Sequence, residues 1–114
     1  MEKEYIEIAG KRYRVECNWN ALTSYLAQVG RDTIEELSKI QAIRPSELTT
    51  LMAACIAEGE RLDGKGETPA PIELGALITP EDVKVFFDIY IRQSNPKRPA
   101  DEPKKEEREE NPAP

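Results

Sequence analysis

Acidic side chains are the most abundant groups in this sequence that could carry chemistry. They stand close together at places such as Glu35-Glu36, Glu58 with Glu60, and Glu81-Asp82. Two carboxylates in a buried cleft can act as general acid and general base. The chain has 22 acidic residues among 114, however, so adjacent acids are expected by chance. Charge runs usually form solvated faces, and we therefore expect a structural or solvated role for each pair.

Other residue types used in catalysis are scarce. The sequence contains no histidine, which removes the commonest general base, the Ser-His and Cys-His pairs and most zinc sites. Cys17 and Cys55 are isolated in the sequence, and Cys55 stands on an apolar helix side, so we expect reduced, inert thiols. Gly64-Lys65-Gly66 lacks the flanking residues of a phosphate-binding loop. The sequence predicts no catalytic residue, cofactor or metal site, and no enzyme.

The net charge and the hydropathy pattern argue against several further classes of function. The net charge is −6, and residues 95–114 supply −1 of it, with five Lys/Arg against six Asp/Glu. An acidic body without a basic block argues against nucleic-acid binding and against an anionic membrane surface. No apolar run is long enough to span a bilayer, and the first residues lack the apolar stretch of a signal peptide. We expect a cytoplasmic protein that binds other proteins.

The elements predict a mainly α fold that begins with a β-hairpin. Residues 4–17 alternate between apolar and polar side chains around a turn at Ala9-Gly10. Placing Ile8 opposite Lys11 puts Glu7 opposite Arg12 and Lys3 opposite Glu16, and opposite charges across a strand pair are stabilising. The same register gathers the apolar side chains on one face, which must lie on another element: Ile6, Ile8, Tyr13 and Val15.

Helical spacing follows the hairpin. A first helix is expected between Asn18 as N-cap and Gly30 as stop, and a short second one from a Thr33/Glu36 capping box. Their predicted inner sides are Trp19, Leu22, Leu26 and Val29, and then Ile34, Leu37 and Ile40. Pro45 begins a third helix that carries Leu48, Leu51, Met52, Cys55 and Ile56 on one side and Ala53, Ala54 and Ala57 on the other. The small alanine side chains on this second side allow another element to pack there, so we expect a central helix with neighbours on two sides.

The second half of the chain completes a small bundle of four to five helices. Residues 62–71 are rich in turn formers and predict a loop. The apolar residues that follow, Ile72, Leu74, Leu77 and Ile78, predict a connector that is either a short helix or an irregular segment. Thr79-Pro80-Glu81-Asp82 predicts the start of a last helix that runs to about Gln93. The domain is thus expected over residues 1–94. Residues 95–114, with five prolines and eleven charges, predict a disordered segment.

Two features suggest where a partner could bind. Trp19 is the only tryptophan, and we expect it to anchor the hairpin onto the helices, with a partner contact as the alternative. In the last helix, Val83, Phe86, Phe87, Tyr90 and Ile91 share one face, whereas Val85 and Ile89 lie nearly opposite. This second stripe predicts either a helix packed on both sides or a partner-binding surface at Val85 and Ile89.

Several segments together resemble one protein family. They are the hairpin around Gly10, Trp19-Asn20-Ala21-Leu22 with Tyr25-Leu26, Pro45-Ser46-Glu47-Leu48 before Leu51-Met52-Ala53-Ala54, Glu58-Gly59-Glu60-Arg61, and Ile78-Thr79-Pro80-Glu81-Asp82-Val83. Over roughly residues 5–92 the chain is similar to the tail assembly chaperones of long-tailed phages, prophages and gene transfer agents. These residues pack and cap helices, and none of them is a catalytic fingerprint.

The resemblance implies a helical chaperone that keeps the tape measure protein soluble while tail tube protein polymerises around it in the bacterial host cytoplasm. It also implies self-association into a homo-oligomer, which would help a body with a small core. Its main rival is a small helical adaptor or regulatory subunit of an unrelated cellular complex. A carboxylate-dependent enzyme is a distant third and would need a buried pair of acids in a cleft.

Overall fold

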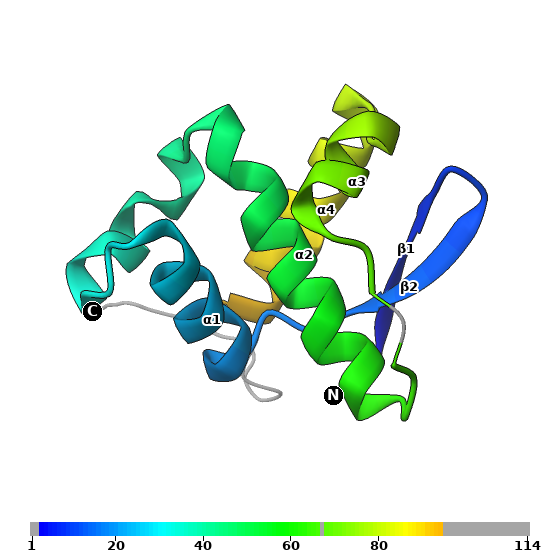
Figure 1. Ribbon diagram of the computed structural model, residues 1–114, viewed down its shortest axis with the longest axis horizontal. Coiled ribbons are helices and arrows are strands. Elements are labelled where there is room, and N and C mark those ends of the chain that lie inside the picture. Colours follow the sequence, from blue (N-terminus) through cyan, green and yellow to red (C-terminus); the bar gives the residue numbers. More distant parts are fainter. Residues whose placement is uncertain (1–2, 67, 95–114) are drawn as a thin grey trace, which may run out of the picture.

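The computed structural model describes residues 3–66 and 68–94 (Figure 1). Its elements are β1 (Glu4–Ile8), β2 (Lys11–Val15), α1 (Trp19–Val29), the 3₁₀ helix η1 (Ile34–Ala42), α2 (Pro45–Leu62), α3 (Pro71–Leu77) and α4 (Pro80–Ser94). A hairpin followed by helices confirms the predicted fold class. The predicted disordered segment, residues 95–114, lies outside the described residues. Within them, no helix is long and apolar enough to cross a membrane.

The hairpin has the predicted register. Ile8 pairs with Lys11 and Glu7 with Arg12. Ala9 and Gly10 have φ values of 53° and 82°, the left-handed pair that a tight two-residue hairpin turn requires. The apolar face is buried as expected, at Ile6, Ile8, Tyr13 and Val15. The Lys3–Glu16 pair was wrong, because the ladder ends at Glu4 and Val15 and the Lys3 amine lies 3.8 Å from Asp63 instead.

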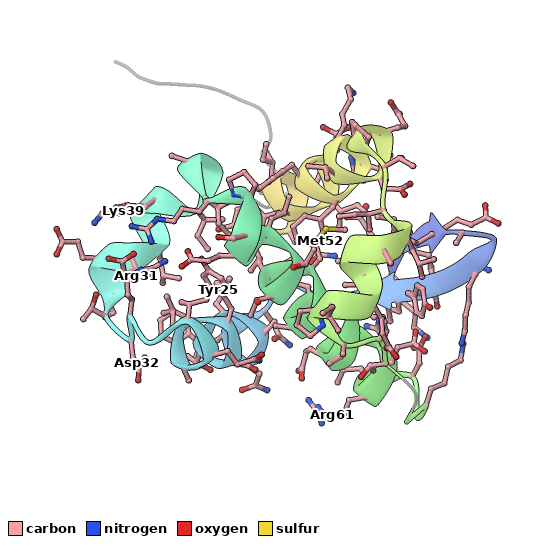
Figure 2. All side chains as sticks on the ribbon, turned by 45° about the horizontal axis from the view of Figure 1, so that its top comes forward. Tyr25, Arg31, Asp32, Lys39, Met52 and Arg61 are labelled. Carbon is pink, nitrogen blue, oxygen red and sulfur yellow. The ribbon has the colours of Figure 1, made fainter. Side chains whose placement is uncertain are left out.

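Helix α2 is the central element, as the alanine residues on one of its sides predicted. It packs against α1, α3 and β2, and Met52 lies amid the side chains at the middle of the molecule (Figure 2). Both of its sides contribute to the core: Leu48, Leu51, Met52, Ala53, Ala54, Cys55 and Ile56 are all buried. The alanines allow neighbouring elements to approach closely, so the core surrounds α2 rather than lying on one side of it.

The outer edge of β2 is fastened to α2. The backbone amide of Glu16 donates to the carbonyl of Cys55 at 3.0 Å, and that of Arg14 donates to the Glu60 carboxylate at 2.9 Å. Between these bonds, Gly59 meets the strand without a side chain; a Cβ atom there would lie 2.2 Å from the carbonyl oxygen of Arg14. The close contact of strand and helix therefore depends on glycine at this position.

The ends of α1 and α4 follow the predicted capping residues. The side chain of Asn18 accepts the amide of Ala21 at 3.0 Å, and Gly30, with φ of 76°, ends α1. The Thr79 hydroxyl accepts the amide of Asp82 at 3.2 Å, while the Asp82 carboxylate accepts the Thr79 amide at 3.0 Å. Helix α4 then packs along β1 and contributes Phe86 to the core.

The second helix differs from its prediction. It is a 3₁₀ helix, and Thr33 makes no side-chain cap. The Glu36 amide donates to the Thr33 carbonyl at 3.1 Å, and the Glu36 carboxylate accepts from Arg31 at 3.2 Å, so neither half of the predicted capping box forms. Ile34, predicted on the inner side, is 75% exposed, whereas Leu37 is partly buried and Ile40 is 2% exposed. Burial increases along the helix, so only its second half reaches the core. Arg31 and Lys39 mark this end of the molecule in Figure 2.

Candidate protein-binding surface

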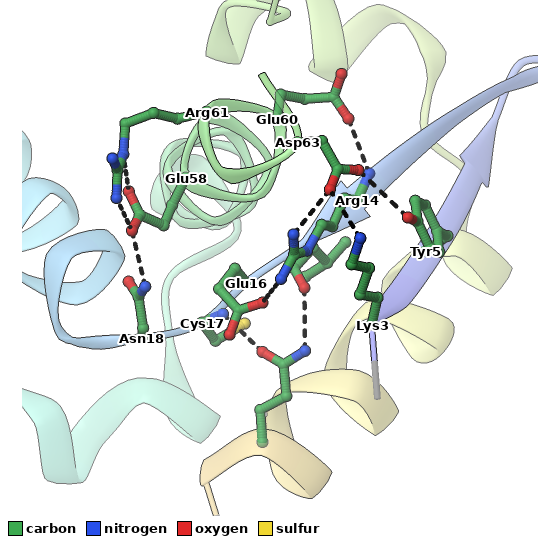
Figure 3. Close-up of polar contacts among 12 residues, drawn as sticks. Lys3, Tyr5, Arg14, Glu16, Cys17, Asn18, Glu58, Glu60, Arg61 and Asp63 are labelled. Carbon is green, nitrogen blue, oxygen red and sulfur yellow. Dashed lines mark hydrogen bonds and ion pairs between the residues drawn. The ribbon is translucent and has the colours of Figure 1, made fainter. Parts of the chain in front are cut away.

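The acids with the greatest chemical interest lie at the end of α2 (Figure 3). Glu58 and Glu60 are only 7% and 4% exposed, which separates them from an ordinary charged surface. Glu58 accepts hydrogen bonds from Arg61 at 2.8 and 2.9 Å and from the Asn18 amide at 2.8 Å. Asp63 accepts from Arg14 at 2.8 Å and from the Tyr5 hydroxyl at 3.3 Å. Each carboxylate thus holds two segments of the chain together.

These bonds favour ionised, structural carboxylates. The hydrogen bonds from Arg61, together with those from Asn18 and Asn20, lower the pKa of Glu58 to about 2. The hydrogen bond from Arg14 likewise lowers the pKa of Asp63. A general acid needs a raised pKa and an open path to substrate. The pKa values of Glu58 and Asp63 are lowered, so neither carboxylate is suited to this role. The expectation of a structural role therefore holds for Glu58, although this carboxylate is buried rather than solvated.

Replacing Glu58 by glutamine should make the stability of the fold less sensitive to acid. The folded pKa of Glu58 lies below its ordinary value of 4.5. Its charge therefore stabilises the fold above about pH 4.5, and this contribution is lost as the pH falls through about 2. Glu58→Gln should cost about 1–3 kcal/mol in the free energy of unfolding at pH 7, from loss of charged hydrogen bonds.

Urea unfolding of the parent and Glu58→Gln at several pH values measures this difference. The two free energies of unfolding should converge as the pH falls from 4.5 towards 2. Glu35→Gln, at an exposed acid of η1, is the control and should follow the parent at every pH. A gap between parent and Glu58→Gln that stays constant across this range would contradict the assignment.

Cys17 and Cys55 are neighbours in space despite their separation in the sequence. Both side chains are buried. Burial and a hydrogen bond with the Cys17 thiol raise the pKa of the Cys55 thiol well above its ordinary value. The prediction of a buried thiol at Cys55 is confirmed, but the interpretation of two isolated cysteines was wrong. Their partnership could not be found from spacing, because β2 and α2 bring them together only in the folded chain.

The predicted binding stripe on α4 is not on the surface. Ile89 is 2% exposed and belongs to the same core as the buried side chains of α2. Val85 is partly buried and packs against that core. Strand β1 packs along α4. Helix α4 has one buried face, formed by Phe86, Ile89 and Tyr90, and its opposite side is exposed at Lys84, Asp88 and Ile91. The helix is therefore not packed on both sides. Ile89 lies on the core face, so it is not available as a partner contact.

Trp19 is also placed differently from its expectation as a core anchor. Its side chain is 59% exposed. The buried residues of α1 are Ala21, Tyr25 and Leu26, whereas Leu22 and Val29 are only partly buried. The buried face is therefore rotated from the predicted stripe towards Ala21 and Tyr25, and only Leu26 belongs to both. Trp19, at the first position of the helix, is left beside solvent.

Trp19→Ala should consequently change stability little. A side chain that is 59% exposed loses far less packing than a buried one, and we expect a cost below about 1 kcal/mol. Thermal unfolding followed by circular dichroism measures it. Tyr25→Ala, at a residue of the same helix that is 4% exposed, is the comparison and should cost about 3 kcal/mol or more. Equal losses for the two variants would contradict the exposed position of Trp19.

Helix α3 displays apolar side chains outward. Leu74 alone is buried, and it anchors the helix on the core. Ile72 and Leu77 are 84% and 45% exposed, and Ala76, one turn after Ile72, is exposed as well. The helix begins with Pro71 and a bond of 2.8 Å from the Ala70 amide to the Glu73 carboxylate, which fix its first turn. We call Ile72, Ala76 and Leu77 the α3 surface.

Two hollows flank α3 and the loop that leads into it. The larger, of about 640 Å³, separates α3 from the hairpin and is lined by Lys11, Tyr13, Gly66, Thr68, Pro69, Glu73, Ala76 and Leu77. The smaller, of about 340 Å³, lies over the alanine side of α2 and is lined by Ser24, Gln28, Ala53, Ala54, Ala57, Thr68, Pro69, Ala70, Pro71 and Glu73. Within the α3 surface, Ala76 and Leu77 thus line the larger hollow, whereas Ile72 lines neither of the two and projects into solvent.

Comparison with protein-family models, curated proteins and solved structures finds no significant match to this chain. The case for a function therefore depends on the chain's own residues. Over residues 3–66 and 68–94, no group of three or more cysteine or acidic side chains is arranged to hold a metal ion. The α3 surface is the feature of this described part that best fits protein binding. The sequence had presented its residues only as an apolar connector.

Proposed function

We propose that this protein is a tail assembly chaperone of a long-tailed phage or prophage, which binds the tape measure protein while tail tube protein assembles around it. The observation that carries the proposal is the α3 surface, where Ile72 and Leu77 are exposed on a helix that Leu74 anchors to the core. Apolar side chains held outward by a folded body give a client an apolar contact without unfolding the chaperone. The resemblance of short sequence segments within residues 5–92 to this chaperone family is the reason for naming the tape measure protein as the client.

The size of the surface suits a reversible chaperone. Two large exposed side chains and their rim bury little area, and association must first offset the lost freedom of both partners. Contact with one segment of a client is therefore weak, and a long client gains affinity by engaging several chaperone molecules. Such binding shields the apolar positions of a helical client and releases them when tube subunits take their place.

The net charge of the chain supports the same role. The chain carries a net charge of −6, and each bound copy adds this charge to its complex with the client. Like-charged complexes repel one another, which opposes aggregation. In this proposal the protein acts in the bacterial cytoplasm, and it self-associates so that several α3 surfaces face one client.

Co-expression with a tape measure protein of a long-tailed phage tests the proposal. The parent should keep most of the client soluble, whereas Ile72→Asp with Leu77→Asp should leave most of it in the pellet. Both positions are exposed, so the double variant should retain the helical circular dichroism of the parent. Ile34→Asp, at a residue that is 75% exposed on η1, is the matched control and should protect the client as the parent does.

Each outcome decides between explanations. Loss of client from the soluble fraction with the α3 double variant alone supports binding at α3. Equal protection by the parent, the double variant and Ile34→Asp would exclude the α3 surface. A client that stays insoluble with the parent protein would contradict the chaperone function itself.

A further inference from the structure

The two cysteines meet where the hairpin passes into the helical body. Cys17 follows β2 and is 6% exposed, and Cys55 lies in the middle of α2 and is fully buried. The bond of 3.0 Å between the Glu16 amide and the Cys55 carbonyl holds the two backbones side by side. On the other flank, the Gln93 side chain accepts a hydrogen bond from the Cys17 backbone amide at 2.6 Å and donates one to the Val15 carbonyl at 3.0 Å. Three elements thus fix the position of the Cys17 backbone beside Cys55.

We infer that Cys17 and Cys55 form an intramolecular disulfide when the protein meets a hydroperoxide. The Cys17 thiolate attacks one peroxide oxygen, the O–O bond breaks, and Cys17 becomes a sulfenic acid as hydroxide leaves. The Cys55 sulfur then attacks the Cys17 sulfur and displaces hydroxide, which takes up the proton of the Cys55 thiol. In total, two thiols and one hydrogen peroxide give one disulfide and two molecules of water.

The order of the two steps follows from how accessible each cysteine is to the hydroperoxide. Cys17 is the more exposed of the pair, and a hydroperoxide is small enough to reach a side chain with 6% exposure during slight local opening. Burial is the larger cause that raises the pKa of the Cys55 thiol, and the hydrogen bond with Cys17 is the second. Cys55 therefore stays protonated, and it reacts only in the second step, with the sulfenic acid of Cys17. An adjacent resolving thiol also protects Cys17 from oxidation to the sulfinic acid.

The disulfide would lock α1 and η1 onto α2. Both elements lie between the two cysteines in the sequence, so the bond closes a loop that contains them. Closing such a loop restricts the unfolded chain and raises the stability of the folded one. The inference depends on the fold and not on the proposed function, so either can fail without the other.

Peroxide treatment of the reduced full chain tests this inference. Intact mass should show the loss of two hydrogen atoms, peptide mapping should join Cys17 to Cys55, and the thermal midpoint should rise by roughly 10 °C. A reducing dithiol should restore both the mass and the midpoint. Cys55→Ala should instead leave Cys17 to be trapped as a sulfenic acid by a dimedone probe.

The mass map of the parent decides the matter even if Cys55→Ala folds poorly. A gain of two or three oxygen atoms on a cysteine, a disulfide between two chains, or unchanged thiols after prolonged peroxide treatment would each overturn the inference. A Cys17–Cys55 disulfide without any rise in the thermal midpoint would show strained geometry and would overturn its stabilising role.

Discussion

Gly59→Ala is expected to separate the hairpin from α2 and to destabilise the fold by about 3 kcal/mol or more. The added Cβ would lie 2.2 Å from the carbonyl oxygen and 2.5 Å from the carbonyl carbon of Arg14. Both atoms belong to the backbone of β2, which cannot rotate away as a side chain can. The strand must move, and its bonds to Glu60 and Cys55 would break or lengthen. Urea unfolding measures the loss.

Gly75→Ala is the matched control, since both glycines lie within helices. A Cβ at Gly75 meets only the Thr49 methyl group at 3.9 Å, which is an ordinary contact. Alanine is the better helix former, so this variant should match the parent or exceed its stability by up to about 1 kcal/mol. If Gly59→Ala also gains stability, the close approach of β2 to α2 is contradicted.

Ile89→Asp is expected to abolish cooperative folding. The side chain is 2% exposed within the core, and a carboxylate there would have to be buried without a partner or be protonated. The expected cost is about 4 kcal/mol or more, which is a large part of the stability of a domain this small. Loss of the helical circular dichroism signal and of the sigmoidal thermal transition measures it.

Ile91→Asp, two residues further along α4, is the matched control. Ile91 is 41% exposed, so its aspartate stays in water and should cost no more than about 1 kcal/mol. A folded Ile89→Asp variant that instead loses self-association would return Ile89 to the partner surface that the sequence suggested.

The hairpin and the helix ends could be predicted from the sequence because their determinants are local. Strand alternation and the charges of Glu7 and Arg12 agree on one register, and only a residue pair able to take positive φ allows that turn. The capping by Asn18 and Thr79 likewise requires only residues three positions apart. Such features depend little on what the rest of the chain does.

The side of a helix that faces the core was harder to predict. Trp19 and Ile34 stand at the first positions of their helices, where neighbouring elements no longer cover them. Helix α4 has apolar side chains on several sides, and periodicity alone cannot tell which of them face the core. The structure resolves this by burying Ile89.

The burial and the partners of Glu58 and Glu60 could not be predicted without the tertiary structure. Glu60 meets the backbone of Arg14, and Glu58 meets Asn18, each across some forty residues of sequence. No local pattern distinguishes these acids from the solvated majority. The α3 surface is a similar case, because only the burial of Leu74 reveals that Ile72 and Leu77 point outward.

A photo-crosslinking experiment at α3 tests the central proposal most directly. A photoreactive benzophenone amino acid replaces Ile72 in one variant and Ile34 in another, and each is irradiated in cells that also make the tape measure protein. Both positions are highly exposed, at 84% and 75%, so neither replacement should disturb the fold. We expect a crosslinked product with the tape measure protein from position 72 and little or none from position 34. Crosslinks of equal yield from the two positions, or none from position 72, would contradict the assignment of the α3 surface as the client-binding site.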